Sequence, residues 1–138
     1  MDAFEASATI RAPADRVWAI LTDGAAYTSW DSGVTRVDGR IADGERITVH
    51  SEIAPGRAFP VTVSMQPPHG MTWSGGMPVG LFRGIRTFTV VPDGETTTVT
   101  MREEYRGPLV GLMSRSVPDL SPSFVRFVNG LKERAEAG

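Results

Sequence analysis

Residues 81–107 read LFRGIRTFTVVPDGETTTVTMREEYRG, and this stretch predicts a β-hairpin. The dipeptide Asp93-Gly94 lies near its middle and is a preferred two-residue hairpin turn. The runs on either side are rich in Thr, Val, Ile, Phe and Tyr, which favour extended strands. With Asp93 and Gly94 as the turn, Pro92 opposes Glu95 and the two strands extend outward from that pair.

The two faces of this hairpin differ in character, because side chains alternate along each strand. One face is rich in Thr and Arg and is expected to be solvated. The other face is mostly apolar and is expected to be buried; it carries Phe82, Gly84, Arg86, Phe88, Val90, Val99, Met101, Glu103 and Tyr105. Two charges therefore fall on the buried face. In this register Arg86 opposes Met101 and Glu103 is its diagonal neighbour, so we expect both charged side chains to lie within about 4 Å of each other or of one bridging water.

The N-terminal segment predicts a strand followed by two short helices. Residues 3–11 alternate between apolar and polar side chains, which is typical of a half-buried strand. Pro13 suits a first helical turn, and apolar residues follow it at helical spacing up to Leu21. The next segment, AAYTSWDSG, is expected to contain a second short helix and a loop.

Apolar residues recur with a strand period in the middle of the chain and with a helical period at its C-terminus. From Val34 to about Gly107, alternating runs separated by Gly- and Pro-containing turns predict strands in an antiparallel meander. After an irregular, proline-containing loop, a helix is expected over roughly Pro122–Glu136, with a serine cap before its first proline. Its apolar stripe consists of Phe124, Phe127, Val128, Leu131 and Ala135.

This order of elements predicts an α+β fold. An antiparallel sheet of about seven strands is expected, with two short helices after the first strand. The apolar face of the sheet is the available partner for the stripe of the long C-terminal helix. The length of 138 residues suits a single domain, residues 1–138, with one core.

The composition excludes several classes of function. Charged residues make up 22% of the chain, the net charge is −2 and no Lys/Arg run is present, so no nucleic-acid partner is expected. The chain contains neither an apolar stretch of membrane-span length nor a signal-peptide core, so no membrane insertion and a cytoplasmic location are expected. The absence of Cys excludes disulfides and thiolate sites. The two histidines, His50 and His69, have no metal-ligand spacing, so neither a metal nor a cofactor is expected.

Several local motifs are similar to those of one known superfamily. The opening IRAPADRVWAILTDGAAYTSW leads from a strand through a proline into a Val-Trp helix and on to Asp23, Tyr27 and Trp30. The segments WSGGMPVGLFRGIRTFTV, EEYRGPL and LKERAE follow in order. Over nearly the whole chain the sequence resembles the SRPBCC superfamily, also called START-like or birch-pollen-allergen-like, and especially its small bacterial members grouped with polyketide cyclases and lipid-transport proteins. The resemblance implies the helix-grip fold, in which a curved antiparallel sheet grips the last helix.

The resemblance also implies a cavity between the sheet and the C-terminal helix. Such a cavity binds a lipid, a polyketide or another apolar small molecule, and sites of this kind usually measure roughly 300–1,000 Å³. Residues 107–121 are expected to form part of its mouth, because their prolines and glycines oppose a regular element. The residues expected around the cavity are Val49, Val63, Trp73, Arg86, Phe88, Met101, Glu103, Tyr105, Phe124, Phe127 and Leu131.

The two buried charges have alternative roles. Members of the superfamily often carry His at the position of Arg86, whereas Glu103 and Tyr105 match. Because a guanidinium does not titrate in a useful range, an acid/base role is not carried over to Arg86. Glu103 is interpreted as an ion partner of Arg86 rather than a general base, since it has no second inward carboxylate. The alternative for Arg86 is to anchor an anionic head group through two hydrogen bonds. No catalytic residue is assigned.

Tryptophans and methionines also fit two interpretations. Trp18 and Trp30 are interpreted as packing residues of the first helices, while Trp73, beside two glycines, fits cavity lining and core equally. Flexible methionines suit a cavity that accepts varied apolar shapes, and ordinary core packing is the simpler interpretation. These methionines are Met65, Met71, Met77, Met101 and Met113.

Three hypotheses for the function follow. The first is a protein that binds an apolar small molecule without chemistry. The second is an enzyme of the aromatase/cyclase type, in which the shape of the same cavity guides ring closure of a polyketide. The third is a protein-interaction module like the heat-shock ATPase activators of the superfamily, although the terminal Gly-Trp signature of that group is absent. Neither the ligand nor the oligomeric state is specified by the sequence.

Overall fold

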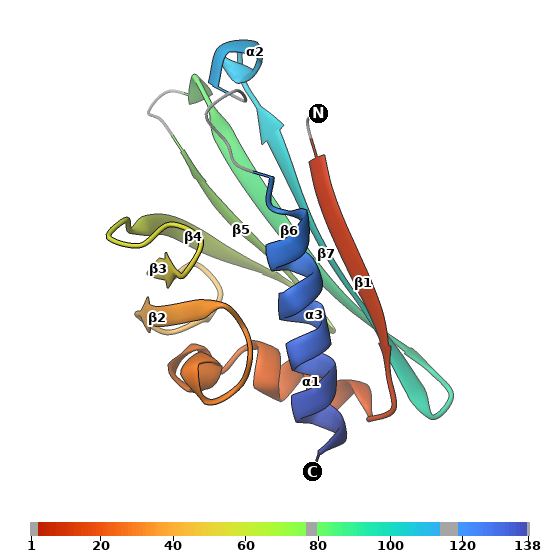
Figure 1. Ribbon diagram of the computed structural model, residues 1–138. Coiled ribbons are helices and arrows are strands. Elements are labelled where there is room, and N and C mark those ends of the chain that lie inside the picture. The colour runs from red at the N-terminus through yellow and green to blue at the C-terminus, as the bar shows by residue number, and fades with distance from the viewer. Residues whose placement is uncertain (1–2, 77–79, 114–118, 138) are drawn as a thin grey trace.

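The computed structural model describes residues 3–76, 80–113 and 119–137. Within these residues the chain forms one strand, two short helices, six further strands, a short helix and a long C-terminal helix (Figure 1). In chain order the elements are β1 (Ala3–Ile10), α1 (Ala14–Leu21), the 3₁₀ helix η1 (Gly24–Ser29), β2 (Val34–Asp38), β3 (Arg46–Ser51), β4 (Phe59–Gln66), β5 (Gly70–Gly76), β6 (Arg83–Asp93), β7 (Thr96–Arg106), α2 (Val110–Met113) and α3 (Ser121–Glu136).

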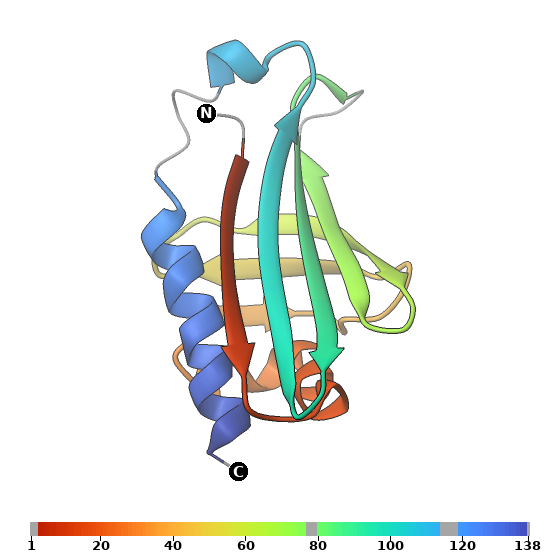
Figure 2. The same ribbon diagram turned by 90° about the vertical axis from the view of Figure 1, so that its right-hand side faces the viewer.

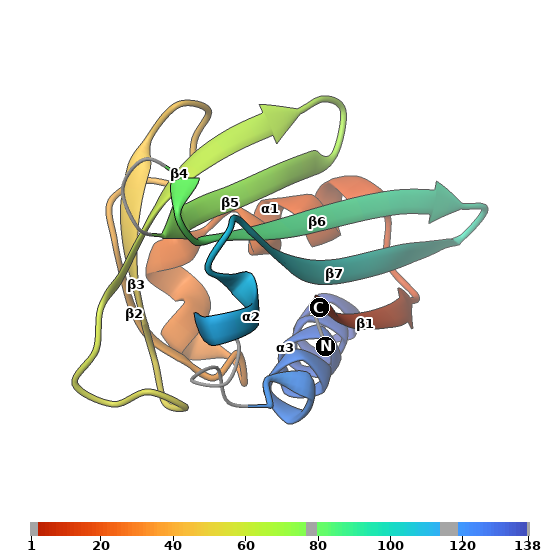
Figure 3. The same cartoon turned by 90° about the horizontal axis from the view of Figure 1, so that it is seen from above.

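The seven strands form one antiparallel sheet in the order β1-β7-β6-β5-β4-β3-β2. The sheet is strongly curved, so that β2, β3 and β4 run across the direction of β6 and β7 (Figure 2). Helix α3 lies on the concave side next to β1, as the view from above shows (Figure 3). This architecture confirms the α+β helix-grip fold predicted from the sequence.

The turn of the β6–β7 hairpin differs from the prediction by one position on each strand. Asp93 pairs with Thr96, so Gly94 and Glu95 form the turn instead of Asp93 and Gly94. Gly94 has a φ of 63°. Two-residue hairpin turns that match the twist of the strands need a positive φ at their first central position, and glycine adopts it without a steric penalty.

This correction moves the cross-strand pairing by two residues. Arg86 therefore lies directly opposite Glu103 rather than opposite Met101. A shift by an even number of residues leaves every side chain on its predicted face, because side chains alternate with a period of two. The apolar face of the hairpin is thus the concave face of the sheet, as expected.

The part of the concave space next to α1, which is the lower part in Figure 1, contains core side chains. Helix α1 starts after Pro13 and buries Val17 and Leu21 completely. It is tied to the end of α3 because the Arg16 Nε donates a hydrogen bond to the Ala135 carbonyl at 2.7 Å. Buried side chains of α1, the strands and α3 thus belong to one core cluster.

Helix α3 begins one residue earlier than predicted and carries its apolar stripe into the core. Pro122 lies in the first turn, where the missing N–H has no helical partner to lose. All the predicted stripe residues are buried; these are Phe124, Phe127, Val128, Leu131 and Ala135.

Candidate ligand-binding site

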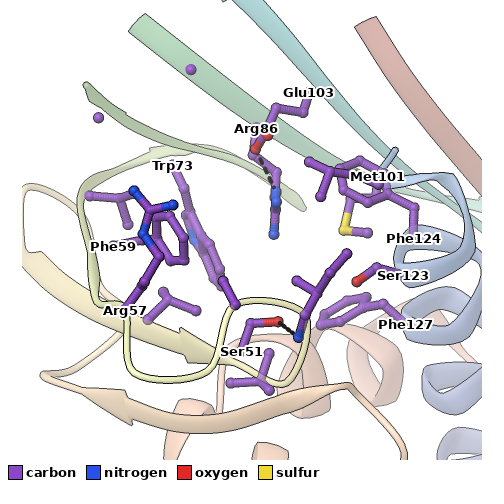
Figure 4. Close-up of a pocket in the computed structure, with 18 of the residues that line it drawn as sticks. Ser51, Arg57, Phe59, Trp73, Arg86, Met101, Glu103, Ser123, Phe124 and Phe127 are labelled. Carbon is purple, nitrogen blue, oxygen red and sulfur yellow. Dashed lines mark hydrogen bonds and ion pairs between the residues drawn. The ribbon is translucent and has the colours of Figure 1, made fainter. Parts of the chain in front are cut away.

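A cavity of about 690 Å³ lies between the concave face of the sheet and the N-terminal half of α3 (Figure 4). Its walls come mainly from β3 to β7, the β3–β4 connection and α3. Ile53 and Phe59 are 42% and 41% exposed, and Arg57 is exposed between them. The cavity therefore reaches solvent beside the β3–β4 connection, and its volume is usual for a small-molecule site.

The cavity has a floor, below which inward side chains fill the space. Phe82, just before β6, and Gly84 and Arg86 on β6 line the cavity, whereas the next inward residues of β6, Phe88 and Val90, are buried in the core. The neighbouring strands and α3 also pass from lining residues to core residues along their length; core residues just beyond the lining ones are Ile47, Val63, Met71, Val99 and Leu131. Arg86 therefore lies at the cavity floor.

The floor contains an ion pair between β6 and β7. The Arg86 Nε donates to the Glu103 Oε1 at 2.9 Å, and the two side chains are 25% and 14% exposed. The guanidinium carbon of Arg86 lies 4.8 Å from the centre of the Phe124 ring, a cation–π distance. Both charges are thus partly desolvated, and each is balanced by the other.

Tyr105 completes the hydrogen bonding of Glu103. Its hydroxyl donates to the Glu103 Oε2 at 2.5 Å. Burial raises the pKa of the Tyr105 hydroxyl, and the neighbouring charge of Glu103 and this hydrogen bond raise it further. The hydroxyl therefore remains a donor at physiological pH. Because both oxygens of Glu103 have donors, Glu103 is poorly placed to act as a general base.

The terminal nitrogens of Arg86 remain available to a ligand. Arg86 donates its hydrogen bond to Glu103 through Nε, and its terminal nitrogens have no hydrogen-bond acceptor within the described parts of the chain. In Figure 4 the guanidinium points into the space between Trp73 on one side and Met101 and Phe124 on the other. The Trp73 Nε1, which is enclosed, also has no acceptor among the described residues. For the residues described, the floor therefore offers donors without partners, whereas each oxygen of Glu103 already accepts one hydrogen bond.

The walls of the cavity are largely aromatic. The rings that line it are those of Phe59, Trp73, Phe82, Tyr105, Phe124 and Phe127. Phe82 and Tyr105 stack, with ring centres 5.6 Å apart and an angle of 10° between the planes. Gly75 and Gly84 pair across β5 and β6 and leave bare backbone on the wall. Flat apolar surfaces are thus presented to a ligand on several sides.

An ion cluster beside the cavity connects α3 with the neighbouring loops. The Arg126 Nε donates to the Asp31 Oδ1 at 2.7 Å, and its terminal nitrogens donate to the two Glu52 oxygens at 3.1 and 3.2 Å. These hydrogen bonds, those to Glu52 first, raise the pKa of Arg126. Glu52 adjoins the lining residues Ser51 and Ile53, so the cluster holds the β3–β4 connection against α3.

The structure places most of the residues expected at the site around one cavity. Those that line it are Val49, Trp73, Arg86, Met101, Glu103, Tyr105, Phe124 and Phe127. Three others do not line it: Val63, Phe88 and Leu131 point inward but lie below the floor and are completely buried. They belong to the core because the cavity occupies only the upper half of the concave space.

Other expectations concerned the mouth, the tryptophans and the methionines. Leu120 lines the cavity, whereas residues 114–118 of the expected mouth segment lie outside the described residues. Trp18 and Trp30 pack against the core, as the packing interpretation expects. Met71 is buried in the core, and Met77 lies outside the described residues.

One wall of the cavity was not predicted from the sequence. This wall is the β3–β4 connection with the start of β4 and contains Ile53, Ala54, Pro55, Arg57, Phe59, Pro60 and Val61. Ser32, Val34, Ser51, Gly75, Gly76, Phe82, Gly84, Leu120 and Ser123 were also not predicted as lining residues. The alternation of residues 59–65 gave the faces of β4, but no local signal showed that the β3–β4 connection and the start of β4 border the same cavity as α3.

The described parts of the chain contain no group of three or more His, Asp or Glu side chains that would hold a metal ion. None of the helices there is long and apolar enough to cross a membrane. What the cavity offers chemically is therefore an apolar volume with hydrogen-bond donors at its floor.

Solved structures share this fold at low sequence identity. A hypothetical protein from Helicobacter pylori is 13% identical, with a TM-score of 0.76 over 97% of this chain and 88% of that one. A START superfamily protein from Mycobacterium smegmatis is 16% identical, with a TM-score of 0.72 over 99% of each chain. The ZhuI aromatase/cyclase from Streptomyces sp. R1128 is 18% identical, with a TM-score of 0.74 over 97% and 93% of the two chains. At these identities the likeness shows the fold alone.

Sequence comparison identifies the family. No curated protein matches this sequence. The sequence profile described as polyketide cyclase / dehydrase and lipid transport matches residues 1–136, nearly the whole chain. The predicted resemblance to the START-like superfamily is thereby confirmed. The chain belongs to the polyketide cyclase/dehydrase and lipid transport family.

Proposed function

We propose that this protein binds an apolar small molecule in the cavity between the sheet and α3 and orients it by hydrogen bonds from Arg86. The observation that carries this proposal is the position of Arg86. Its terminal nitrogens lie at the floor of a cavity of about 690 Å³ whose walls are mostly aromatic and aliphatic. A few polar groups in an apolar cavity are the usual design of a small-molecule site, because apolar contact supplies affinity and the polar groups fix the orientation.

The energetics of the ion pair support a role in binding. Replacing a buried ion pair by apolar side chains of similar volume is often neutral or stabilising. Folding alone therefore gives no reason for two charges at the boundary between the cavity and the core. A ligand gives such a reason, since it gains a fixed hydrogen bond from the Arg86 terminal nitrogens in a site that excludes most water.

A pair of fluorescent or quenching probes tests this proposal. Phenylnaphthylamine, which is apolar, and methyl naphthyl ketone, which adds one carbonyl, are titrated while tryptophan emission is followed. Both are expected to bind and to quench Trp73. Arg86→Met is expected to lower the affinity for the ketone by roughly tenfold or more, because a hydrogen bond from a charged group is lost. The affinity for phenylnaphthylamine is expected to stay nearly unchanged.

Arg102→Met is the matched control, because Arg102 is an exposed arginine on the outer face of β7. The double variant Arg86→Met/Glu103→Leu repeats the measurement without an unpaired charge at the floor. Equal losses of ketone affinity in the Arg86 and Arg102 variants would show that Arg86 does not contact the ligand. Failure of both probes to bind the parent protein would contradict the proposed function itself.

The second candidate is an aromatase/cyclase-like enzyme that uses the same cavity. The specific observation in its favour is the Arg86 donor pair, which would polarise a substrate carbonyl and favour its enol. The ZhuI aromatase/cyclase shares the fold. Against this reading, both Glu103 oxygens already accept hydrogen bonds, so no free base is evident at the floor. The third hypothesis, a protein-interaction module, gains no support from the described residues.

Proton exchange separates binding from this chemistry. A β-diketone attached to a naphthyl ring is incubated with the protein in deuterated buffer, and loss of its central proton signals is followed by NMR. An enzyme that enolises the carbonyl is expected to accelerate the exchange by roughly 10²-fold or more, and Arg86→Met is expected to abolish the acceleration. Exchange at the rate of buffer, with the diketone demonstrably bound, supports binding without chemistry.

A further inference from the structure

The floor of the cavity combines charge balance with a shortage of hydrogen-bond acceptors. We infer that the cavity selects neutral aromatic carbonyl compounds, such as aryl ketones, quinones and aryl esters, over carboxylates with the same ring system. This inference names the ligand class of the proposed binding site and therefore rests on the proposed function.

The charges at the floor cancel. Among the described residues, three charged side chains line the cavity: Arg57, Arg86 and Glu103. Arg57 belongs to the exposed rim, near the Phe59 ring. At the floor, Arg86 and Glu103 are joined by a hydrogen bond of 2.9 Å. The floor therefore has no net charge with which to attract an anion.

A carboxylate at this floor would be poorly compensated. It would gain attraction from Arg86, but it would also lie close to Glu103, because a single guanidinium separates the two groups. Attraction and repulsion then largely offset each other, while the carboxylate still loses its hydration on entering the cavity. A neutral carbonyl loses far less hydration and keeps the hydrogen bonds from the terminal nitrogens of Arg86.

The hydrogen-bond inventory also favours a ligand that accepts. Glu103 receives donors on both oxygens, from Arg86 and from Tyr105. The wall hydroxyls of Ser32 and Ser51 donate to the carbonyls of Tyr27 and Gly33. The deep end of a ligand therefore meets donors from Arg86, and a carbonyl oxygen, which only accepts, suits them better than a hydroxyl group.

The walls add the preference for an aromatic ring. Rings from β4, β5, β7, α3 and the segment just before β6 surround the cavity, and the paired Gly75 and Gly84 leave flat backbone beside them. A planar ring next to the carbonyl contacts these surfaces over a large area without losing internal rotations. A saturated chain loses rotational freedom when it is confined in the same volume.

Three probes with one ring system test the inference: methyl naphthyl ketone, methyl naphthoate and naphthoate. Only naphthoate is charged at neutral pH. With the parent protein, calorimetric titration is expected to show the two neutral probes bound at least about tenfold more tightly than naphthoate. Tighter binding of naphthoate than of both neutral probes would overturn the inference and leave the proposed function in place. If none of the three probes, nor phenylnaphthylamine, binds, the proposed function fails together with the inference.

A charge substitution tests the cause of the selectivity. Glu103→Gln removes the negative charge from the floor, so naphthoate is expected to bind at least about tenfold more tightly. The affinity for the ketone is expected to change by less than about threefold. Glu104→Gln is the matched control, since it removes the same charge from the next residue of β7, on the outer face. An equal gain in both variants would mean that overall charge controls the affinity, and this would overturn the inference. Should Glu103→Gln fail to fold, the three-probe comparison on the parent protein decides.

Discussion

Arg86 on β6 lies directly opposite Glu103 on β7, and its Nε donates to the carboxylate at 2.9 Å at the floor of the cavity. The pair stands at the boundary between lining residues above and core residues below. It is held from both sides, by the Tyr105 hydroxyl on Glu103 and by the Phe124 ring beside the guanidinium. This relationship determines the polarity of the cavity.

Breaking the pair is expected to destabilise the protein, and removing it altogether is not. Arg86→Met leaves Glu103 without its counter-charge and should lower the free energy of unfolding by about 1–3 kcal/mol, less than for a fully buried pair because both side chains are partly exposed. The double variant Arg86→Met/Glu103→Leu should recover most of this loss. Urea unfolding followed by circular dichroism measures both. Additive losses in the double variant would contradict a coupled pair.

Both tyrosines are expected to remain protonated until the protein unfolds in alkali. The chain has two tyrosines. Burial is the main cause that raises the pKa of Tyr27 and of Tyr105. The folded state thus holds both phenolic protons more tightly than the unfolded state, so this contribution to stability is complete below the ordinary pKa of about 10 and is lost as the pH rises above it. Ultraviolet absorbance should show tyrosinate appearing only together with loss of the circular dichroism signal. Ionisation of one tyrosine in the folded protein would contradict this.

Gly130→Ala is expected to destabilise the protein although Gly130 lies inside a helix. Helix propensity alone predicts a stabilisation of about 1 kcal/mol. A Cβ at this position would, however, lie 2.2 Å from the carbonyl oxygen of Asp31, which belongs to the backbone. The chain would have to shift there, so we expect a net loss of about 1–3 kcal/mol in urea unfolding.

Gly111→Ala is the matched control for this prediction. Among the described residues outside its chain neighbours and its own helix backbone, a Cβ on Gly111, in α2, would have no heavy atom within 4 Å. This variant should unfold at the same urea concentration as the parent or slightly above it. Stabilisation by Gly130→Ala would mean that α3 lies farther from Asp31 than the structure places it.

The space in front of Gly84 is expected to matter for binding rather than for folding. Among the described residues, a Cβ there would meet only the Tyr105 ring, at 3.4 and 3.6 Å, which is ordinary contact. Gly84→Ala should therefore fold and bind like the parent, within about threefold. Gly84→Leu should place its side chain in the cavity and lower the affinity for methyl naphthyl ketone by at least about tenfold. The free energy of unfolding should change by less than about 1 kcal/mol. Unchanged affinity in the Leu variant, measured by calorimetry, would show that ligands do not occupy this part of the cavity.

The agreement between sequence and structure is best where short-range periodicity decides. The alternation in residues 3–11 and 81–107 and the stripe on α3 assign faces correctly, because the position of a side chain depends only on the local backbone period. The predicted position of the hairpin turn was wrong by one residue, because Asp93-Gly94 and Gly94-Glu95 both place a glycine in the turn. The choice between them depends on which central position carries the positive φ of Gly94.

The local period also explains why three of the expected residues point inward without lining the cavity. Val63, Phe88 and Leu131 point inward as predicted, but periodicity gives the direction of a side chain and not the depth of the space in front of it. Phe59 and Arg57 line the cavity because the curved sheet brings the start of β4 and the β3–β4 connection around the same space as α3, and curvature of this kind arises from the packing of the whole sheet.

The sequence by itself determined the class of fold, the order of the elements and the presence of two opposite charges on an apolar face. These properties follow from local geometry and from the solvation of individual side chains. Only the tertiary structure decided that Arg86 bonds Glu103 through Nε, that Tyr105 occupies the second carboxylate oxygen and that a cavity remains above them. The physical reason is that hydrogen-bond partners and empty volume depend on distances between residues far apart in the chain, and only the packed sheet and helix set those distances.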